Sequence, residues 1–118
     1  MAEPTIAQIF GTGATRLASG ASAPSAGLFI PDTALIAAGL TTPTTASGEG
    51  HFVAVLINGQ TYLTQTAFDS NIDQSIYVST GFSSFTTRGT DNDPYTVRQL
   101  TINLAKLDDG STLNPGDY

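Results

Sequence analysis

The large apolar side chains of this sequence are concentrated in its second half. All four tyrosines and four of the six phenylalanines follow residue 50, whereas Ala, Gly, Ser, Thr and Pro dominate the first half. A chain of 118 residues can bury roughly two-thirds of the surface that it exposes when unfolded, which is enough for one core. We therefore expect a single core built by the second half, and two halves that are folded to different extents.

Composition divides the chain into three regions. We expect an N-terminal arm with short docked elements at residues 1–50, a β-rich core at 51–107 and an extended C-terminal tail at 108–118. Residues 11–27 and 41–50 are rich in Gly, Ser, Thr or Pro, a composition that buries little apolar surface by itself and is typical of loops. The predicted fold class is α+β, mainly antiparallel β: a small β-sheet core with one or two short helices and extended N- and C-terminal arms.

Two short helices are predicted in the first 40 residues, over residues 5–10 and 33–38. Gly11 ends the first helix, because glycine commonly stops a helix. Asp32 is the expected N-cap of the second helix and Gly39 its C-terminal stop. Brief strands are predicted at residues 14–17 and 27–30.

Residues 51–65 fit two structures. The run Phe52–Ile57 is rich in β-branched residues, and Asn58-Gly59 after it is a strong hairpin signal, because a type I′ turn needs two positive φ angles. The same run also fits a buried helix that is capped by Ser47 and continues towards Leu63. The turn signal favours the hairpin, and the helix is the alternative.

A second hairpin is predicted from the two long stretches that flank the loop 88–94. The stretch 75–87 is a strand followed by a kink or a further strand, and it is expected to pair antiparallel with a strand at 95–107. The apolar residues of the latter change parity between Val97 and Leu100. One inserted residue at Arg98-Gln99, a β-bulge, would place both sets on the core side.

The surface predicted from composition is poor in charge. Charged residues make up 12% of the chain, against roughly 25% in an average soluble domain, so Ser, Thr, Asn and Gln supply most of its polarity. Hydroxyl and amide groups are buried against another subunit at lower cost than charges, because each buried charge needs a partner. This composition favours a chain that is packed in an assembly; the alternative is a monomer that is rich in threonine.

Net charge excludes one large class of partner. The formal net charge is -6, and the four basic residues are scattered along the sequence at Arg16, Arg88, Arg98 and Lys106. Phosphate backbones would be repelled by this chain, so we expect no nucleic-acid partner. No stretch approaches the length and apolarity of a membrane span, and no membrane partner is expected.

Residues that could support catalysis do not form a recognisable set. His51 is the only histidine and no cysteine is present, so a cysteine–histidine pair is excluded. The segment Gly81–Phe85 contains two serines but lacks the second glycine of a nucleophile elbow. Three carboxylate pairs lie in polar, loop-like stretches, which favours a role in turns over acid catalysis. These pairs are Asp69/Asp73, Asp91/Asp93 and Asp108/Asp109. We predict no catalytic residue and no enzyme.

Two motifs resemble ligand loops only in part. Asp69, Asn71 and Asp73 match the first three ligand positions of a calcium loop, but Gln74 replaces its turn glycine and Thr80 its bidentate glutamate. An Asx-turn is the alternative that we favour for this segment. The segment Gly11-Thr-Gly13-Ala-Thr-Arg16 lacks the third glycine of a dinucleotide loop. No metal site and no cofactor site are predicted.

The four tyrosines raise a further possibility. Exposed aromatic rings can stack on sugars, so the tyrosines favour a small glycan- or ligand-binding β-module as an alternative function. The absence of tryptophan weakens that alternative. The tyrosines concerned are Tyr62, Tyr77, Tyr95 and Tyr118.

The two ends of the sequence carry a resemblance to a known group of proteins. The chain opens with Met1-Ala-Glu-Pro-Thr-Ile-Ala-Gln-Ile-Phe-Gly11 and ends with Leu107-Asp-Asp-Gly-Ser-Thr-Leu-Asn-Pro-Gly-Asp-Tyr118, with a Gly/Ala/Ser/Thr stretch and a compact centre between them. In this outline it resembles small virion structural proteins, of the capsid cement or decoration type, from tailed phages that infect cyanobacteria. The resemblance covers the whole chain and includes no diagnostic motif.

This resemblance implies a structural role. It implies a protein on the capsid surface of a virion, present in the host cytoplasm during assembly, that bridges and stabilises neighbouring major capsid proteins. The expected partners are the major capsid protein and other copies of the chain in a homo-oligomer. A tail or baseplate component is the alternative that the same resemblance leaves open.

Overall fold

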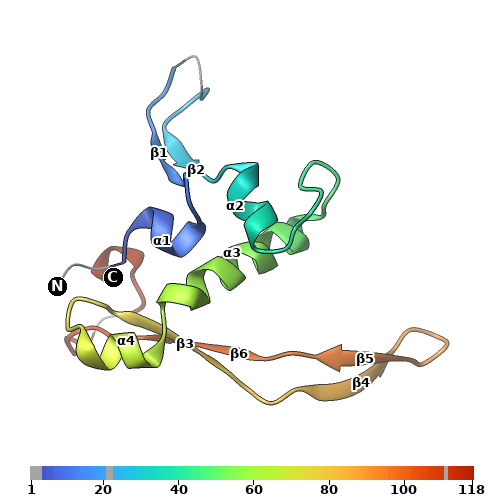
Figure 1. The fold of residues 1–118 in the computed structure, drawn as a ribbon. Coiled ribbons are helices and arrows are strands. Elements are labelled where there is room, and N and C mark those ends of the chain that lie inside the picture. Colours follow the sequence, from blue (N-terminus) through green and yellow to red (C-terminus); the bar gives the residue numbers. More distant parts are fainter. Residues whose placement is uncertain (1–3, 21–22, 111) are drawn as a thin grey trace.

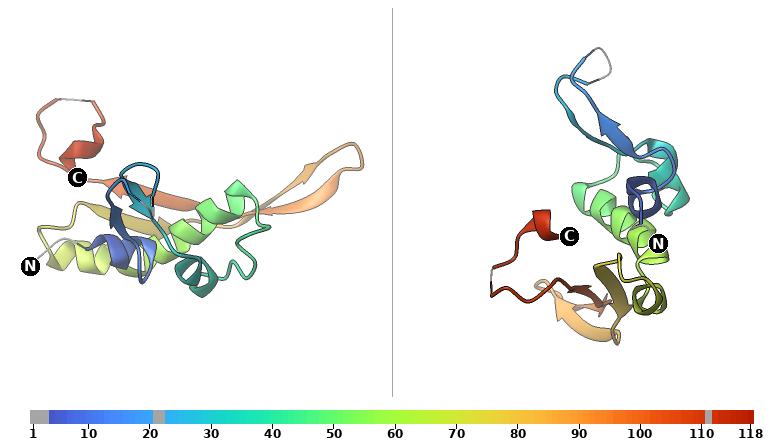
Figure 2. Two further views of the ribbon diagram at one scale, coloured as in Figure 1. Left: turned by 90° about the horizontal axis from the view of Figure 1, so that it is seen from above. Right: turned by 90° about the vertical axis from the view of Figure 1, so that its left-hand side faces the viewer.

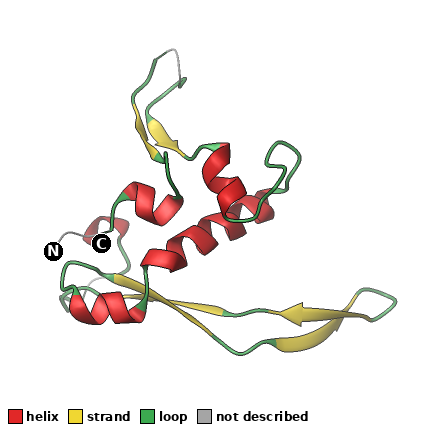
Figure 3. Ribbon diagram, in the orientation of Figure 1, coloured by secondary structure: helices red, strands yellow, loops and turns green. Residues whose placement is uncertain are grey.

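The structure is a computed structural model that describes residues 4–20, 23–110 and 112–118. Within these residues it has four α-helices and six short strands, and every strand pair is antiparallel, so the predicted α+β class is confirmed. The helices gather in one body, and two hairpins project from it (Figures 1 and 3). The helical part is larger than the sequence predicted.

The first helix, α1, spans Ile6–Phe10 as predicted and is held by its caps. Thr5 accepts a hydrogen bond from the Gln8 backbone N–H at 3.2 Å, and the Gln8 side chain accepts one from the Thr5 N–H at 2.8 Å. Gly11 ends the helix with a φ of 111°, and a Cβ at this position would lie 2.4 Å from the Ala34 Cβ. Only glycine fits here, so α1 and the helix that carries Ala34 approach closely.

The helix α2 spans Asp32–Ala37. Its N-cap is Pro31, which makes no side-chain cap, and Asp32 is the first residue of the helix, so the prediction of Asp32 as N-cap is wrong. The carboxylate still lies in the first turn, where the helix dipole favours negative charge. Gly39 follows the helix with a φ of 111°, which confirms it as the C-terminal stop.

The helix α3, Gly48–Tyr62, replaces the hairpin that was favoured for residues 51–65. Ser47 caps it by accepting a hydrogen bond from the Gly50 N–H at 3.0 Å, so the predicted helix and its cap are confirmed and the hairpin is wrong. Only Ala54 and Gly59 of this helix are buried, so the prediction that the helix is buried is wrong. The supposed turn residues serve tertiary contacts instead. The Asn58 amide donates to the carbonyls of Phe10, at 3.3 Å, and Ala34, at 3.1 Å. Asn58 thereby ties α1 and α2 to α3.

A fourth helix, α4 at Gln65–Ser70, was not predicted. Thr64 caps it by accepting from the Ala67 N–H at 3.1 Å. Beyond it, the buried Gln74 side chain donates to the carbonyls of Thr64, at 3.2 Å, and Ile76, at 2.8 Å. This amide joins the start of α4 to the start of the next strand.

The long hairpin consists of two ladders. Strand β3, Ile76–Thr80, pairs with β6, Leu100–Leu104, and strand β4, Ser84–Arg88, pairs with β5, Asp93–Val97. The antiparallel hairpin across the 88–94 loop is therefore confirmed.

The bulge in this hairpin lies on the opposite strand from the predicted one. Between the two ladders, residues 81–83 of one strand face residues 98–99 of the other, so the extra residue is in 81–83 rather than at Arg98-Gln99. A Cβ at Gly81 would stand 3.1 Å from the Gln99 side chain, and the Gly81 N–H donates to the Gln99 carbonyl at 2.8 Å. Gly81 therefore has little room for a side chain at the start of the bulge.

The remaining elements are short. Strands β1, Thr15–Leu17, and β2, Gly27–Phe29, confirm the two brief strands that were predicted; they pair with each other and project from the helices (Figure 2). A 3₁₀ turn, η1 at Pro115–Asp117, follows the hairpin near the end of the chain. Lys106 and Asp117 form an ion pair of 2.9 Å, which holds this turn near the end of β6.

The buried apolar residues are few and mostly small. Among the described residues they are Ala14, Ala34, Leu35, Ala54 and Leu63. The large side chains of the second half were expected to supply the core, yet several of them are exposed, so that expectation is wrong. The radius of gyration is 17.2 Å, against about 13.5 Å for a compact domain of this length. The chain is therefore unusually open.

Candidate interaction surface

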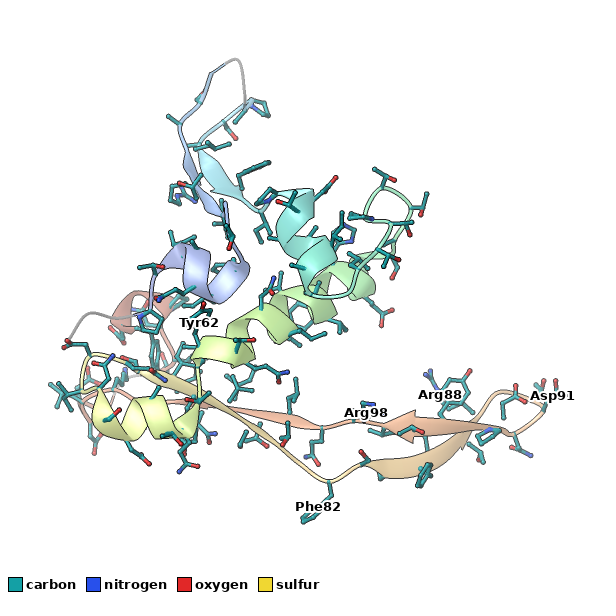
Figure 4. The ribbon with its side chains drawn as sticks, viewed as in Figure 1. Tyr62, Phe82, Arg88, Asp91 and Arg98 are labelled. Carbon is teal, nitrogen blue, oxygen red and sulfur yellow. The ribbon has the colours of Figure 1, made fainter. Side chains whose placement is uncertain are left out.

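The most exposed part of the structure is residues 81–99, here called the projecting hairpin. It contains β4 and β5, and every one of its residues is exposed to solvent. Phe82 is 94% exposed and Phe85 is 81% exposed. Figure 4 shows Phe82 pointing away from the helical body, on the other side of the hairpin from Arg88. At these exposures neither ring is buried against the described part of the chain.

The two faces of the projecting hairpin differ. Phe85 stands opposite Thr96, and Tyr95 stands opposite Thr86, so alternation places the two aromatic rings on different faces. The Arg88 guanidinium lies over the Tyr95 ring, 5.2 Å from its centroid. Tyr95 and Val97, predicted to face the core, are 45% and 44% exposed. That prediction is wrong, because every residue of β4 and β5 is exposed.

A second exposed patch lies on α3. Glu49, Phe52, Val53 and Ile57 are spaced at i, i+3, i+4 and i+8, so they share one side of the helix. All four are exposed, and the Phe52 side chain is 64% exposed. We call these four residues the α3 stripe. A surface helix normally buries such a stripe, which suggests that α3 is covered on this side by something else.

The total exposed surface matches these local observations. It amounts to 8545 Å², whereas a compact monomer of 12.2 kDa exposes about 6,100 Å². The difference of about 2,400 Å² exceeds the roughly 800 Å² that each partner buries in a standard interface. The chain has enough uncovered surface for more than one interface.

Charges are distributed unevenly between the body and the projecting hairpin. Lys106 pairs with Asp109 at 3.4 Å and with Asp117 at 2.9 Å. Arg88 and Arg98 form no ion pair with any described carboxylate. The projecting hairpin carries these two arginines together with Asp91 and Asp93, so its formal net charge is zero, whereas the rest of the chain has Arg16 and Lys106 against eight acidic residues.

The residues considered for catalysis lie far apart in the fold. His51 is in the first turns of α3, where its Nδ1 lies 2.8 Å from the Ser47 carbonyl oxygen. Asp91 and Asp93 lie at the tip of the projecting hairpin, and Asp108 and Asp109 follow β6. In residues 4–20, 23–110 and 112–118, no three His, Asp or Glu side chains gather as metal ligands would.

The segment that resembles a calcium loop forms a turn between α4 and β3. The Asn71 Oδ1 accepts a hydrogen bond from the Asp73 N–H at 3.1 Å, which is an Asx-turn. Gln74, which breaks the calcium-loop pattern, is buried and bonded to two carbonyls. The glycine-rich segment after Gly11 leads from α1 into β1, so it does not open a helix as a dinucleotide loop does.

The tyrosines do not gather into one platform. Tyr77 packs on Phe68 with ring centroids 4.8 Å apart, and Tyr95 lies under Arg88 on the projecting hairpin. Tyr62 is at the end of α3, and Tyr118 follows η1. The four rings come from different elements, and among the described residues no two of them are in ring contact.

Comparison of the chain with protein-family models, curated proteins and solved structures finds no match. Over the described residues, the helices are too short or too polar to span a bilayer. What the chain can do must therefore be argued from its own surface.

Proposed function

We propose that this protein is a virion structural subunit, a capsid cement or decoration protein that bridges neighbouring major capsid proteins. The observation that carries the proposal is the excess of uncovered surface, 8545 Å² against about 6,100 Å² for a compact monomer. A subunit that becomes covered in an assembly needs this surplus, whereas a free monomer does not. The resemblance of the two chain ends to capsid cement and decoration proteins supports a capsid as the site of that assembly.

The projecting hairpin supports an assembly role. An isolated two-stranded hairpin is at best marginally stable in water, because stability needs a third strand or a packed face. Burial of an exposed phenylalanine contributes about 1.5–3 kcal/mol, so Phe82 and Phe85 together offer several kcal/mol to a partner. A hairpin of this kind gains its packing when it reaches a neighbouring subunit.

The composition of the remaining surface fits the same role. Few of its groups are charged, and hydroxyl and amide groups can be hydrogen-bonded across an interface at small cost. Acidic residues outside the projecting hairpin complement basic patches on a lattice protein. A tail or baseplate component is the alternative with the same physical support. A glycan-binding module gains none, because no two tyrosine rings are in contact among the described residues.

The test is the presence and position of the chain in assembled virions. Particles are purified from cells that produce this protein and analysed by mass spectrometry and by cryo-electron microscopy. We expect many copies at symmetry-related positions on the capsid surface. Density on the tail would replace the cement role by the tail or baseplate alternative, and complete absence from particles would contradict the proposal.

A further inference from the structure

The two ladders of the long hairpin differ in how they are attached to the helical body. The inner ladder, β3 with β6, is held there by specific contacts. The Val78 N–H donates to the Leu63 carbonyl at 2.8 Å, and the Tyr77 ring packs on Phe68 with ring centroids 4.8 Å apart. Four of the five residues of β3 are partly buried. The inner ladder is therefore fixed to the helical body.

The outer ladder, β4 with β5, has no such attachment. Every residue of both strands is exposed. Among the described residues, no hydrogen bond or ion pair joins either strand to a helix. The two strands pair with each other, from Ser84 opposite Val97 to Arg88 opposite Asp93. The direction of the outer ladder relative to the body is therefore determined at the junction between the two ladders.

This junction is weakly paired. Residues 81–83 of one strand face residues 98–99 of the other, and the two strands part there (Figure 1). Of the hydrogen bonds between described residues, one joins the two segments, from the Gly81 N–H to the Gln99 carbonyl at 2.8 Å. Phe82 is 94% exposed and points away from the body (Figure 4). The bulge thus interrupts the ladder, and no buried side chain holds the junction in one shape.

We propose that residues 81–83 and 98–99 form a hinge, about which the outer ladder swings as one unit relative to the inner ladder and the helical body. Such hinges are a few residues that absorb changes in φ and ψ while the elements on either side stay intact. The swing breaks at most the hydrogen bond between Gly81 and Gln99, and it separates no buried side chains. The hinge allows the exposed strands to meet a partner at more than one angle. It is a property of the single chain and does not depend on the capsid role.

A deletion of one residue removes the hinge and leaves both ladders intact. In the chain that lacks Ser83, two residues face two across the junction. The two remaining residues can then pair with Arg98 and Gln99, which makes the ladder continuous. The matched control is Ser83→Ala, which changes the same exposed position and keeps the extra residue. Far-UV circular dichroism checks that both variants fold.

Distances between pairs of spin labels, measured by double electron–electron resonance, give the readout. The chain has no cysteine, so cysteines introduced at exposed positions carry the labels. The hinge pair joins Glu49→Cys on α3 to Asp91→Cys in the turn between β4 and β5. The body pair joins Glu49→Cys to Thr101→Cys on β6. A frozen sample retains every angle of the swing, whatever its rate.

The width of each distance distribution tests the hinge. With the unaltered hinge and with Ser83→Ala, we expect the distribution of the hinge pair to be at least about twice as wide as that of the body pair. In the chain that lacks Ser83, the two widths should be equal. A hinge pair as narrow as the body pair in the unaltered chain, or one that stays broad after the deletion, would overturn the proposal.

A third label pair distinguishes a swing from melting of the outer ladder. Ser84→Cys and Asp91→Cys both lie beyond the junction, at the start of β4 and in the turn that follows it. If the outer ladder moves as a unit, the distance between them is constant, and we expect a distribution as narrow as that of the body pair. A broad distribution for this pair would show that the ladder melts, and it would overturn a hinge that moves an intact ladder.

Discussion

At the scale of single residues, the structure depends on a few polar and glycine positions rather than on large apolar ones. Gln74 is the clearest case, because its side chain is buried and its amide joins two backbone carbonyls from different segments. The sequence identified this residue only as a departure from a calcium loop. Its role could not be predicted, since the two carbonyls that it meets are placed by the fold and not by the local sequence.

Replacement of Gln74 tests this role. In Gln74→Leu the carbonyls of Thr64 and Ile76 lose their donor, and the expected loss in free energy of unfolding is about 1–3 kcal/mol. Urea denaturation measures the loss. The matched control is Gln65→Leu at an exposed position, expected within about 0.5 kcal/mol of the unaltered chain. Equal urea midpoints for Gln74→Leu and Gln65→Leu would show that the Gln74 amide makes no stabilising hydrogen bond.

Two glycines give a paired prediction of opposite sign. Gly11→Ala places a Cβ 2.4 Å from the Ala34 Cβ at a φ of 111°, so we expect a loss of more than about 1 kcal/mol. Gly48→Ala meets no atom within 4 Å at the start of α3, and we expect a gain of up to about 1 kcal/mol. Thermal unfolding of both variants checks the two signs. A stable Gly11→Ala protein would contradict the close packing of α1 on α2.

At the scale of elements, local sequence signals predicted the short helix and the short strands correctly. They failed for the segment whose secondary structure is determined by contacts with residues distant in the sequence. The capped helix at residues 6–10 and the strands at 15–17 and 27–29 follow from nearby residues, and the structure confirms them. Asn58-Gly59 has the local pattern of a hairpin turn, yet Asn58 lies inside α3 because its amide bonds to α1 and α2. Tertiary contacts overrode the turn preference at this point.

The projecting hairpin gives a prediction for an element. Its residues are all exposed, so deletion of 84–97, which leaves a short loop between β3 and β6, should remove little buried surface. We expect a thermal midpoint within a few degrees of the full chain, because a change of about 1 kcal/mol shifts it by roughly 4–8 °C in a domain of this size. Calorimetry measures the midpoint. Loss of cooperative unfolding in the shortened chain would mean that the hairpin is part of the folded core.

At the scale of the whole molecule, the chain exposes surface that a compact monomeric domain would bury. Composition indicated a surface suited to burial, because charged residues are only 12% of the chain. It did not indicate which surface: Phe52, Phe82 and Phe85 were assigned to a core and are exposed. Periodicity distinguishes an apolar face from a polar one, but it does not distinguish a face buried within the chain from one buried by another molecule.

Hydrogen exchange of the β4 and β5 amides, compared between dilute monomer and the assembled form, tests most directly whether this open surface is covered by other subunits. In the monomer these amides should exchange quickly, as expected of an unsupported two-stranded hairpin. In the assembly we expect exchange slowed by about 100-fold or more, while amides of α2 near Leu35 change little. Equally fast exchange of β4 and β5 in both states would contradict the account.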